Sequence, residues 1–153
     1  MTTFLLRYLS ALLLVSQGVC MTVAVAADEF LPPEQAFRFE ARTIDANQVE
    51  VVFNVADGYS LYRERFAFAA APAAVKLGKP VIPPGQFKFD ENFGKNLETH
   101  RGRVVIRLPI ESATAAFTLT VTSQGCADAG LCYAPMQSSA RLSLAKASSK
   151  AGQ

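Results

Sequence analysis

The sequence has a small net charge, a single histidine and few cysteines. Its 153 residues hold 15 Lys and Arg against 13 Asp and Glu. Such a near-neutral balance gives no indication of electrostatic binding to nucleic acid or anionic lipid. The one histidine, His100, stands in LETHRG, without the serine or acidic motif of a hydrolase. Nucleic-acid binding and hydrolysis are therefore not expected.

Long apolar runs are also scarce. No apolar run within residues 28–153 reaches the roughly 20 residues that a membrane-spanning helix needs. The N-terminus differs, because Arg7 precedes an apolar stretch over residues 9–19, and the small-residue run AVAA ends at Ala27. This pattern is typical of a secretory signal peptide cleaved near Ala27. A membrane anchor is the alternative, which the short apolar stretch disfavours.

Removal of residues 1–27 leaves a soluble, exported chain with two cysteines, Cys126 and Cys132. We expect a single domain over residues 28–146 and a flexible tail over residues 147–153. In an oxidising compartment the two thiols form a disulfide unless another molecule reduces them.

Alternation of apolar and polar residues predicts β-structure in the exported chain. In AFTLTVTS, Phe117, Leu119 and Val121 alternate with threonines. The same period of two occurs in segments 36–41, 49–55, 103–108, 116–123 and 140–145. Turn residues separate these segments, which favours an all-β, two-sheet antiparallel sandwich. We expect irregular connections or loops at residues 69–76, 79–85 and 91–96.

The two cysteines lie in QGCADAGLCYAP, residues 124–135, with five residues between them. Gly125 and Gly130 permit positive φ angles, so the chain can turn back and bring the sulfurs together. A ring this short stabilises a fold by only about 2 kcal/mol in the chain-entropy estimate. A structural staple would do more between distant strands, which shifts the interpretation modestly towards redox work. From the spacing alone, however, a structural bridge comes before a redox pair.

Two other roles for the cysteine pair stay open. One is a soft-metal site for Cu(I), in which Met136 and His100 join the two cysteines. The spacing of these residues is not a recognised metal pattern. The other is a binding or interaction sandwich whose disulfide is purely structural.

Three segments resemble, in order and spacing, the N-terminal periplasmic domain of the DsbD thiol:disulfide interchange family. QGCADAGLCYAP resembles its cysteine segment, DGYSLYRERF (57–66) its tyrosine segment, and DENFGKNLETHRGRVVIRLPI (90–110) its cap-loop stretch with the following strand. The resemblance covers about residues 30 to 145. It implies a periplasmic, immunoglobulin-like β-sandwich whose cysteine pair cycles between dithiol and disulfide without a cofactor.

The resemblance also implies roles and partners. Cys132 attacks and forms the mixed disulfide, and Cys126 resolves it, as in a protein-disulfide reductase. The implied partners are thioredoxin-like periplasmic proteins, namely a disulfide isomerase and a cytochrome c maturation thioredoxin. Electrons would come from a DsbD- or CcdA-like membrane protein. The chain stops at Gln153, before the family's membrane helices, so it is either a free-standing version or a fragment. The signal peptide and the polar tail favour a free-standing version, which we expect to be a monomer.

A loop that covers the disulfide is carried over from the family as Asp90, Glu91, Asn92, Phe93 and Gly94. Asn92 stands where better-known members have phenylalanine, so Phe93 is expected to be the cover, with ordinary core packing as the alternative. The carboxylates of Asp90 and Glu91 would disfavour a nearby thiolate. The tyrosines expected beside the site are Tyr59, Tyr62 and Tyr133.

Overall fold

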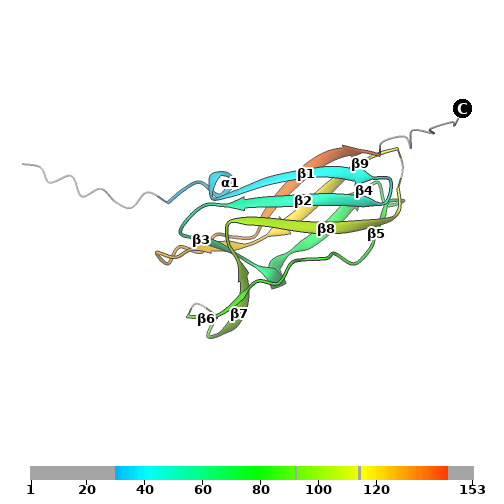
Figure 1. Ribbon diagram of the computed structural model, residues 1–153. Coiled ribbons are helices and arrows are strands. Elements are labelled where there is room, and N and C mark those ends of the chain that lie inside the picture. Colours follow the sequence, from blue (N-terminus) through cyan, green and yellow to red (C-terminus); the bar gives the residue numbers. More distant parts are fainter. Residues whose placement is uncertain (1–29, 92, 114, 145–153) are drawn as a thin grey trace, which may run out of the picture.

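The protein is built almost entirely from antiparallel strands (Figure 1). The computed structural model describes residues 30–91, 93–113 and 115–144. The elements are α1 (Pro33–Ala36), β1 (Phe37–Asp45), β2 (Gln48–Val55), β3 (Tyr59–Tyr62), η1 (Arg63–Arg65), β4 (Ala67–Ala71), β5 (Lys76–Leu77), β6 (Gln86–Asp90), β7 (Lys95–His100), β8 (Arg103–Ser112), β9 (Ala116–Ser123), β10 (Gly125–Ala127) and β11 (Met136–Ser143). None of the helices in these three ranges is both long and apolar enough to cross a membrane.

Some expectations fall outside the described residues. The signal peptide over residues 1–27 and the tail over residues 147–153 do so, as does Asn92 of the cap loop. The expected domain bounds of 28 and 146 also lie just beyond the described ranges.

Two sheets form the sandwich that holds the main core. One has the strand order β1-β2-β8-β5 and the other the order β11-β9-β4 (Figure 1). The period of two sends alternate side chains inward, and the buried ones are Val49, Val51 and Phe53 of β2, Val104, Ile106 and Leu108 of β8, and Phe117, Leu119 and Val121 of β9. Each such side chain stabilises the fold by about 1.5–3 kcal/mol when fully buried.

This arrangement is the immunoglobulin-like antiparallel sandwich that the sequence predicts. Each of the five expected segments overlaps a strand, namely β1, β2, β8, β9 and β11. The last strand begins at Met136, four residues before the expected start at residue 140. With this polar first half included, β11 pairs with β9 along the whole length of both strands, which the alternation of Leu142 and Leu144 alone does not reveal.

Residues 69–71 differ from the expectation of an irregular connection, because they belong to strand β4. Their register runs from Ala67 opposite Thr122 to Ala71 opposite Thr118. Alanine has a low strand propensity, so pairing with β9 and not local preference places this segment in the sheet. β4 is an edge strand, and Pro72, which has no N–H to donate, follows its last residue.

A third sheet, with the order β10-β3-β7-β6, carries the candidate site. Its β6–β7 hairpin projects from the sandwich (Figure 1). Within β3 the side chains alternate, so that Tyr59 and Leu61 enter the main core. Tyr62 instead joins a second, small cluster with Leu97 and Cys126. β3 therefore links the rigid sandwich to the surroundings of the cysteines.

Candidate functional site

Cys126 and Cys132 form a disulfide across a short turn. Inside the turn, the amide of Ala127 donates to the carbonyl of Leu131 at 2.8 Å, and the amide of Gly130 donates to the carbonyl of Ala127 at 3.0 Å. Gly130 has a φ of 101°, a left-handed value that residues with a side chain rarely adopt. The backbone of the loop thus holds the two cysteines together.

Gly125 allows β10 to lie closely against β3. A Cβ atom added to it would lie 2.4 Å from the carbonyl oxygen of Ser60 and 2.6 Å from ring carbons of Phe37. Both separations are far below contact distance, so the position requires glycine. The close approach puts the next residue, Cys126, opposite Ser60 and within reach of Tyr62.

The two cysteines differ in exposure. Cys126 is 5% exposed and belongs to the buried cluster with Tyr62 and Leu97. Cys132 is only half-buried and packs against this cluster, as does Phe93. Solvent therefore has better access to Cys132 than to Cys126.

The hydroxyl of Tyr62 lies between a carboxylate and a sulfur. It donates to Oδ2 of Asp90 at 2.5 Å, and its oxygen also lies 3.1 Å from Sγ of Cys126. The carboxylate is the stronger of the two acceptors for a single hydroxyl hydrogen. Burial first, and then the bond to Asp90, raises the pKa of Tyr62 well above its ordinary value. Tyr62 therefore remains a neutral hydrogen-bond donor beside the disulfide.

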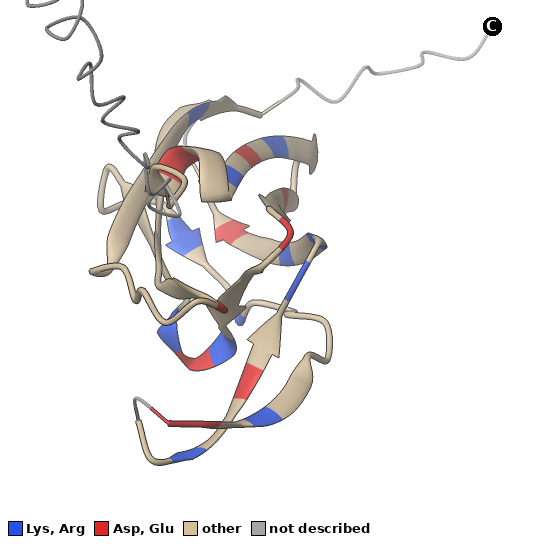
Figure 2. Ribbon diagram, turned by 90° about the vertical axis from the view of Figure 1, so that its left-hand side faces the viewer, with Lys and Arg blue, Asp and Glu red and all other residues tan. Residues whose placement is uncertain are grey.

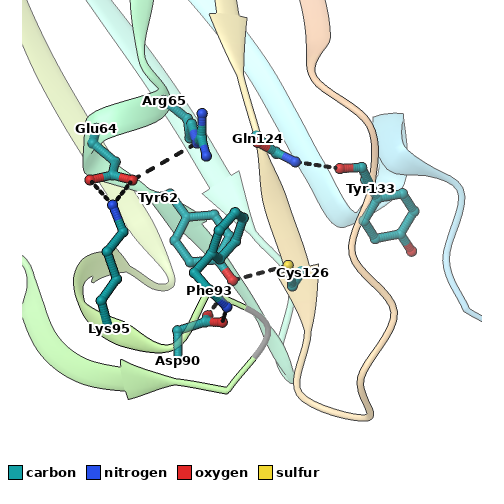
Figure 3. Close-up of polar contacts among 9 residues, drawn as sticks. All are labelled: Tyr62, Glu64, Arg65, Asp90, Phe93, Lys95, Gln124, Cys126 and Tyr133. Carbon is teal, nitrogen blue, oxygen red and sulfur yellow. Dashed lines mark hydrogen bonds and ion pairs between the residues drawn. The ribbon is translucent and has the colours of Figure 1, made fainter.

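Phe93 lies over this arrangement at the tip of the β6–β7 hairpin (Figure 3). Its ring meets that of Tyr62 edge to face, with centroids 5.4 Å apart and planes at 79°. Its amide donates to Oδ1 of Asp90 at 3.2 Å, and the amide of Gly94 donates to the carbonyl of Asp90 at 2.8 Å. The carboxylate of Asp90 thus connects the backbone of the hairpin tip to the Tyr62 hydroxyl.

Tyr59 and Tyr133 lie together on the other side of β3 and β10, away from Tyr62. Tyr59 accepts a hydrogen bond from the amide of Leu31 at 2.8 Å, and Tyr133 donates one to the carbonyl of Leu31 at 2.6 Å. Both rings pack on Phe37. Figure 3 shows the Tyr133 ring turned away from Phe93. Among the three tyrosines, Tyr62 has its side chain beside Cys126, whereas the rings of Tyr59 and Tyr133 pack on Phe37.

A cavity of about 230 Å³ opens beside Cys126 on the hairpin side. Asp90 and Glu91 contribute acidic groups to its lining, and Lys88 and Arg101 contribute basic groups. Glu91 is exposed, and of the two carboxylates only Asp90 reaches Tyr62.

Asp128 and Arg101 form an ion pair that sequence reasoning missed. Two guanidinium nitrogens of Arg101 contact the two carboxylate oxygens of Asp128 at 2.5 and 2.8 Å. This contact lowers the pKa of Asp128. Arg101 also donates to the carbonyl of Tyr59, and the amide of Asp128 donates to the carbonyl of Gly58. These bonds anchor the loop between the two cysteines to the end of β7 and to the turn before β3.

A second missed contact involves Arg65, the last residue of η1. Its guanidinium carbon lies 5.3 Å from the centroid of the Phe93 ring. Its position in DGYSLYRERF gave a signal of proximity to Tyr62, but no sequence pattern pairs it with a residue 28 positions away.

The residues considered for a copper site lie in different surroundings. His100 is buried beside Phe66, and Met136 packs on the main core, whereas Cys126 belongs to the second cluster. Within the described ranges, no three side chains of the types His, Cys, Asp and Glu gather as they would around a metal ion.

The sequence matches a known protein family along most of its length. Residues 27–144 match the family described as "Thiol:disulfide interchange protein DsbD, N-terminal". Among curated proteins, the DsbD of Ralstonia nicotianae is 53% identical over 137 residues, and that of Klebsiella pneumoniae is 38% identical over 142 residues. These alignments cover 90% and 88% of this chain but only 22% and 23% of the relatives, so the chain spans about a fifth of their length.

Two solved structures are similar in fold as well as in sequence. The reduced N-terminal domain of Neisseria meningitidis DsbD is 33% identical, with a TM-score of 0.68, and the match covers 74% of this chain and 90% of that one. The complex between the DsbD N-terminal and PilB N-terminal domains of the same organism is 34% identical, with a TM-score of 0.63, covering 75% and 88%.

Proposed function

Because this chain belongs to the family of DsbD N-terminal domains, we propose that it is a disulfide reductase component that exchanges thiols and disulfides with other proteins through Cys126 and Cys132. One observation carries the proposal. The two cysteines are bonded in a loop that closes on itself, outside the main core, beside a small cluster against which Phe93 also packs. A disulfide placed this way can open without moving the sandwich.

The reductive step is written with Cys132 as the attacking group, because it is the more exposed of the two. The Cys132 thiolate attacks one sulfur of a partner disulfide, a mixed disulfide forms, and the other partner sulfur leaves as a thiolate. The Cys126 thiolate then attacks Cys132 Sγ, which breaks the mixed disulfide and releases the second partner sulfur. The partner gains two electrons and, after protonation, two thiols, while Cys126 and Cys132 become the disulfide.

The reverse sequence of exchanges reduces the Cys126–Cys132 disulfide to the dithiol. A thiolate of an upstream dithiol donor attacks Cys132 Sγ, and Cys126 leaves as a thiolate. The second thiolate of the donor then attacks the donor sulfur in this mixed disulfide, so that Cys132 leaves as a thiolate and the donor becomes the disulfide. Tyr62 can stabilise the Cys126 leaving group when its hydroxyl hydrogen turns from Asp90 to Cys126 Sγ, which lies 3.1 Å from the hydroxyl oxygen. The negative charge of the nearby Asp90 carboxylate disfavours the Cys126 thiolate, so protonation of Cys126 to the neutral thiol is favoured.

Phe93 and the loop over residues 90–94 are proposed to gate access. The packing of the Phe93 ring and of Cys132 against the same buried cluster supports this role. Glu91 and Gly94 belong to the same loop, and Gly94, with a φ of 63°, supplies the turn that follows Phe93.

The proposed partners are thioredoxin-like proteins of the periplasm, including a disulfide isomerase and a cytochrome c maturation thioredoxin. A DsbD- or CcdA-like membrane protein is the proposed electron donor. The solved complex of a similar DsbD N-terminal domain with the PilB N-terminal domain supports docking to another protein domain. We also propose export to the periplasm with cleavage near Ala27, and a domain over residues 28–146.

Trapping of mixed disulfides tests this function. In Cys126→Ser the attacking Cys132 has no resolving partner, so adducts with thioredoxin-like proteins are expected on non-reducing gels of periplasmic extracts. The matched control, Cys132→Ser, retains only the buried sulfur and is expected to trap nothing. Absence of adducts from both variants, together with a wild-type pair that is never reduced in cells, would overturn the proposal in favour of a structural disulfide.

A further inference from the structure

The η1 turn, Arg63–Arg65, contacts the hairpin tip that carries Phe93. η1 follows Tyr62 directly, so the strand that approaches Cys126 continues into this turn. Figure 2 shows its basic, acidic and basic residues in succession beside the hairpin. Figure 3 shows the Arg65 side chain extending toward the Phe93 ring, which lies against Tyr62. The ring is therefore in contact with both Arg65 and Tyr62.

The contact between Arg65 and Phe93 has the geometry of a cation–π interaction. The guanidinium carbon lies 5.3 Å from the ring centroid, within the roughly 6 Å over which the ring quadrupole attracts a cation. The Arg65 side chain is 41% exposed, so the contact lies near the surface. Its competing partner, Glu64, is more distant than a hydrogen bond, at 4.0 Å from Arg65 Nε.

Glu64 contacts the same hairpin at a second point. Its carboxylate lies 3.3 Å from Nζ of Lys95, the first residue of β7 after the tip. Both side chains are about half exposed, and ion pairs of this kind stabilise proteins little. Lys95 lies in strand β7 of the hairpin, whereas Arg65 contacts the Phe93 ring itself. Of the two contacts, the one made by Arg65 bears directly on access to the disulfide.

We propose that Arg65 is a positioning residue that holds the Phe93 ring over the Cys126–Cys132 disulfide and so sets how often the site is open. The proposal rests on the function proposed above, because it concerns access to that same disulfide. Neither the sulfurs nor a partner need to touch Arg65 for this role. It acts through the ring alone.

The expected size of the effect follows from the strength of the contact. Loss of an exposed cation–π contact raises the population of the open form about two- to fivefold, if the closed form predominates. Reduction of the disulfide by a small thiol should become faster by the same factor.

The test is the rate at which excess dithiothreitol reduces the disulfide in the purified exported chain. Arg65→Met removes the cation and keeps an unbranched stem, so reduction should be about two- to fivefold faster than in wild type. Arg65→Lys retains a cation and should stay close to wild type. The attacking reagent is an anionic thiolate, so loss of a nearby positive charge alone would slow the reaction. A faster reaction therefore points to access and not to charge.

Two further variants separate the ring contact from other effects. Arg141→Met makes the same substitution at an exposed position of β11, which pairs with β9 in a different sheet from the hairpin, and should leave the rate unchanged. In a Phe93→Ala background, Arg65→Met should add no acceleration, because the ring it acts through is gone. Acceleration in that background, or a wild-type rate in Arg65→Met when Phe93→Ala is fast, overturns the role of Arg65.

The outcome is independent of partner trapping. If the disulfide of Arg65→Met is reduced faster but no partner is trapped, this inference stands and the proposed function fails. Trapped partners alongside an unchanged Arg65→Met rate leave the function standing and overturn this inference. Thermal unfolding of the oxidised variants, expected to be nearly unchanged, excludes a general loosening of the fold as the cause of faster reduction.

Discussion

The hydroxyl of Tyr62 donates to the carboxylate of Asp90 at 2.5 Å, which connects strand β3 to the β6–β7 hairpin next to its tip. Asp90 uses its second carboxylate oxygen to accept from the amide of Phe93. The position of Phe93 thus depends on the Asp90 carboxylate, which the Tyr62 hydroxyl holds in place. Since the pKa of Tyr62 is raised, mainly by burial, this donor persists at any pH at which thiols exchange.

Tyr62→Phe is expected to destabilise the oxidised protein by about 1–2 kcal/mol, because it removes a hydrogen bond to a charged group without removing the ring. Urea unfolding of wild type and variant measures the loss. The double-mutant cycle with Asp90→Ala is the control, since the two changes remove the same bond. Strictly additive losses would show that the Tyr62 hydroxyl and Asp90 are not coupled.

The fold should survive reduction of its disulfide. The ring closed by Cys126 and Cys132 is short, so its loss costs about 2 kcal/mol in the chain-entropy estimate. The main core lies between β2, β8 and β9 and contains neither cysteine. Urea unfolding with and without dithiothreitol should therefore give one cooperative transition in each case, at a lower midpoint for the reduced protein. A reduced protein that is unfolded without urea would indicate a staple.

Much of the sandwich could be predicted because its signal is local. In β9, Phe117, Leu119 and Val121 alternate with threonines, and all three are buried. β4 could not be predicted in the same way. Its alanines have no strong preference for a strand, and their place in the sheet depends on hydrogen bonds to β9, some 50 residues away.

The site shows the same division. The pairing of Cys126 with Cys132 could be predicted from their motif and spacing, and the position of Phe93 near them from its place in the loop. The tyrosines were not separable by motif, because Tyr59 and Tyr62 differ only in which face of β3 they occupy. Tyr59 and Tyr62 are three residues apart in a strand, so their side chains point to opposite faces. Which of the two faces the cysteines becomes clear only when the two clusters are known.

The pair of Arg101 and Asp128 should contribute about 0.5–1 kcal/mol to stability at neutral pH. The contact is bidentate, but both side chains are more than a third exposed, so the upper part of the range for surface pairs applies. A double-mutant cycle with Arg101→Met and Asp128→Asn, followed by urea unfolding, measures the coupling. Repeating the cycle in 1 M NaCl should shrink the coupling energy. A value near zero at low salt would mean that the pair does not anchor the cysteine loop.

Stability should fall in acid partly through Glu50 of β2, far from the cysteines. Its carboxylate is 3% exposed and lies 2.6 Å from a nitrogen of Arg42 and 2.8 Å from one of Arg107. The hydrogen bond from Arg42, with the attraction of Arg107, lowers the pKa of Glu50 despite its burial. The unfolded chain therefore binds this proton more tightly than the folded protein does. The stabilisation is complete above about pH 4.5 and is lost as the pH falls through the lower folded-state pKa.

Glu50→Gln isolates this contribution. At neutral pH the variant should unfold at lower urea than wild type, because Arg42 and Arg107 lose their shared carboxylate. As the pH falls below about 4.5 the two unfolding curves should converge, since wild-type Glu50 becomes neutral as well. Glu40→Gln, at an exposed position of β1, is the matched control and should follow wild type at every pH. A Glu50→Gln deficit of constant size down to pH 3 would assign the loss to packing of the amide and not to the charge between the two arginines.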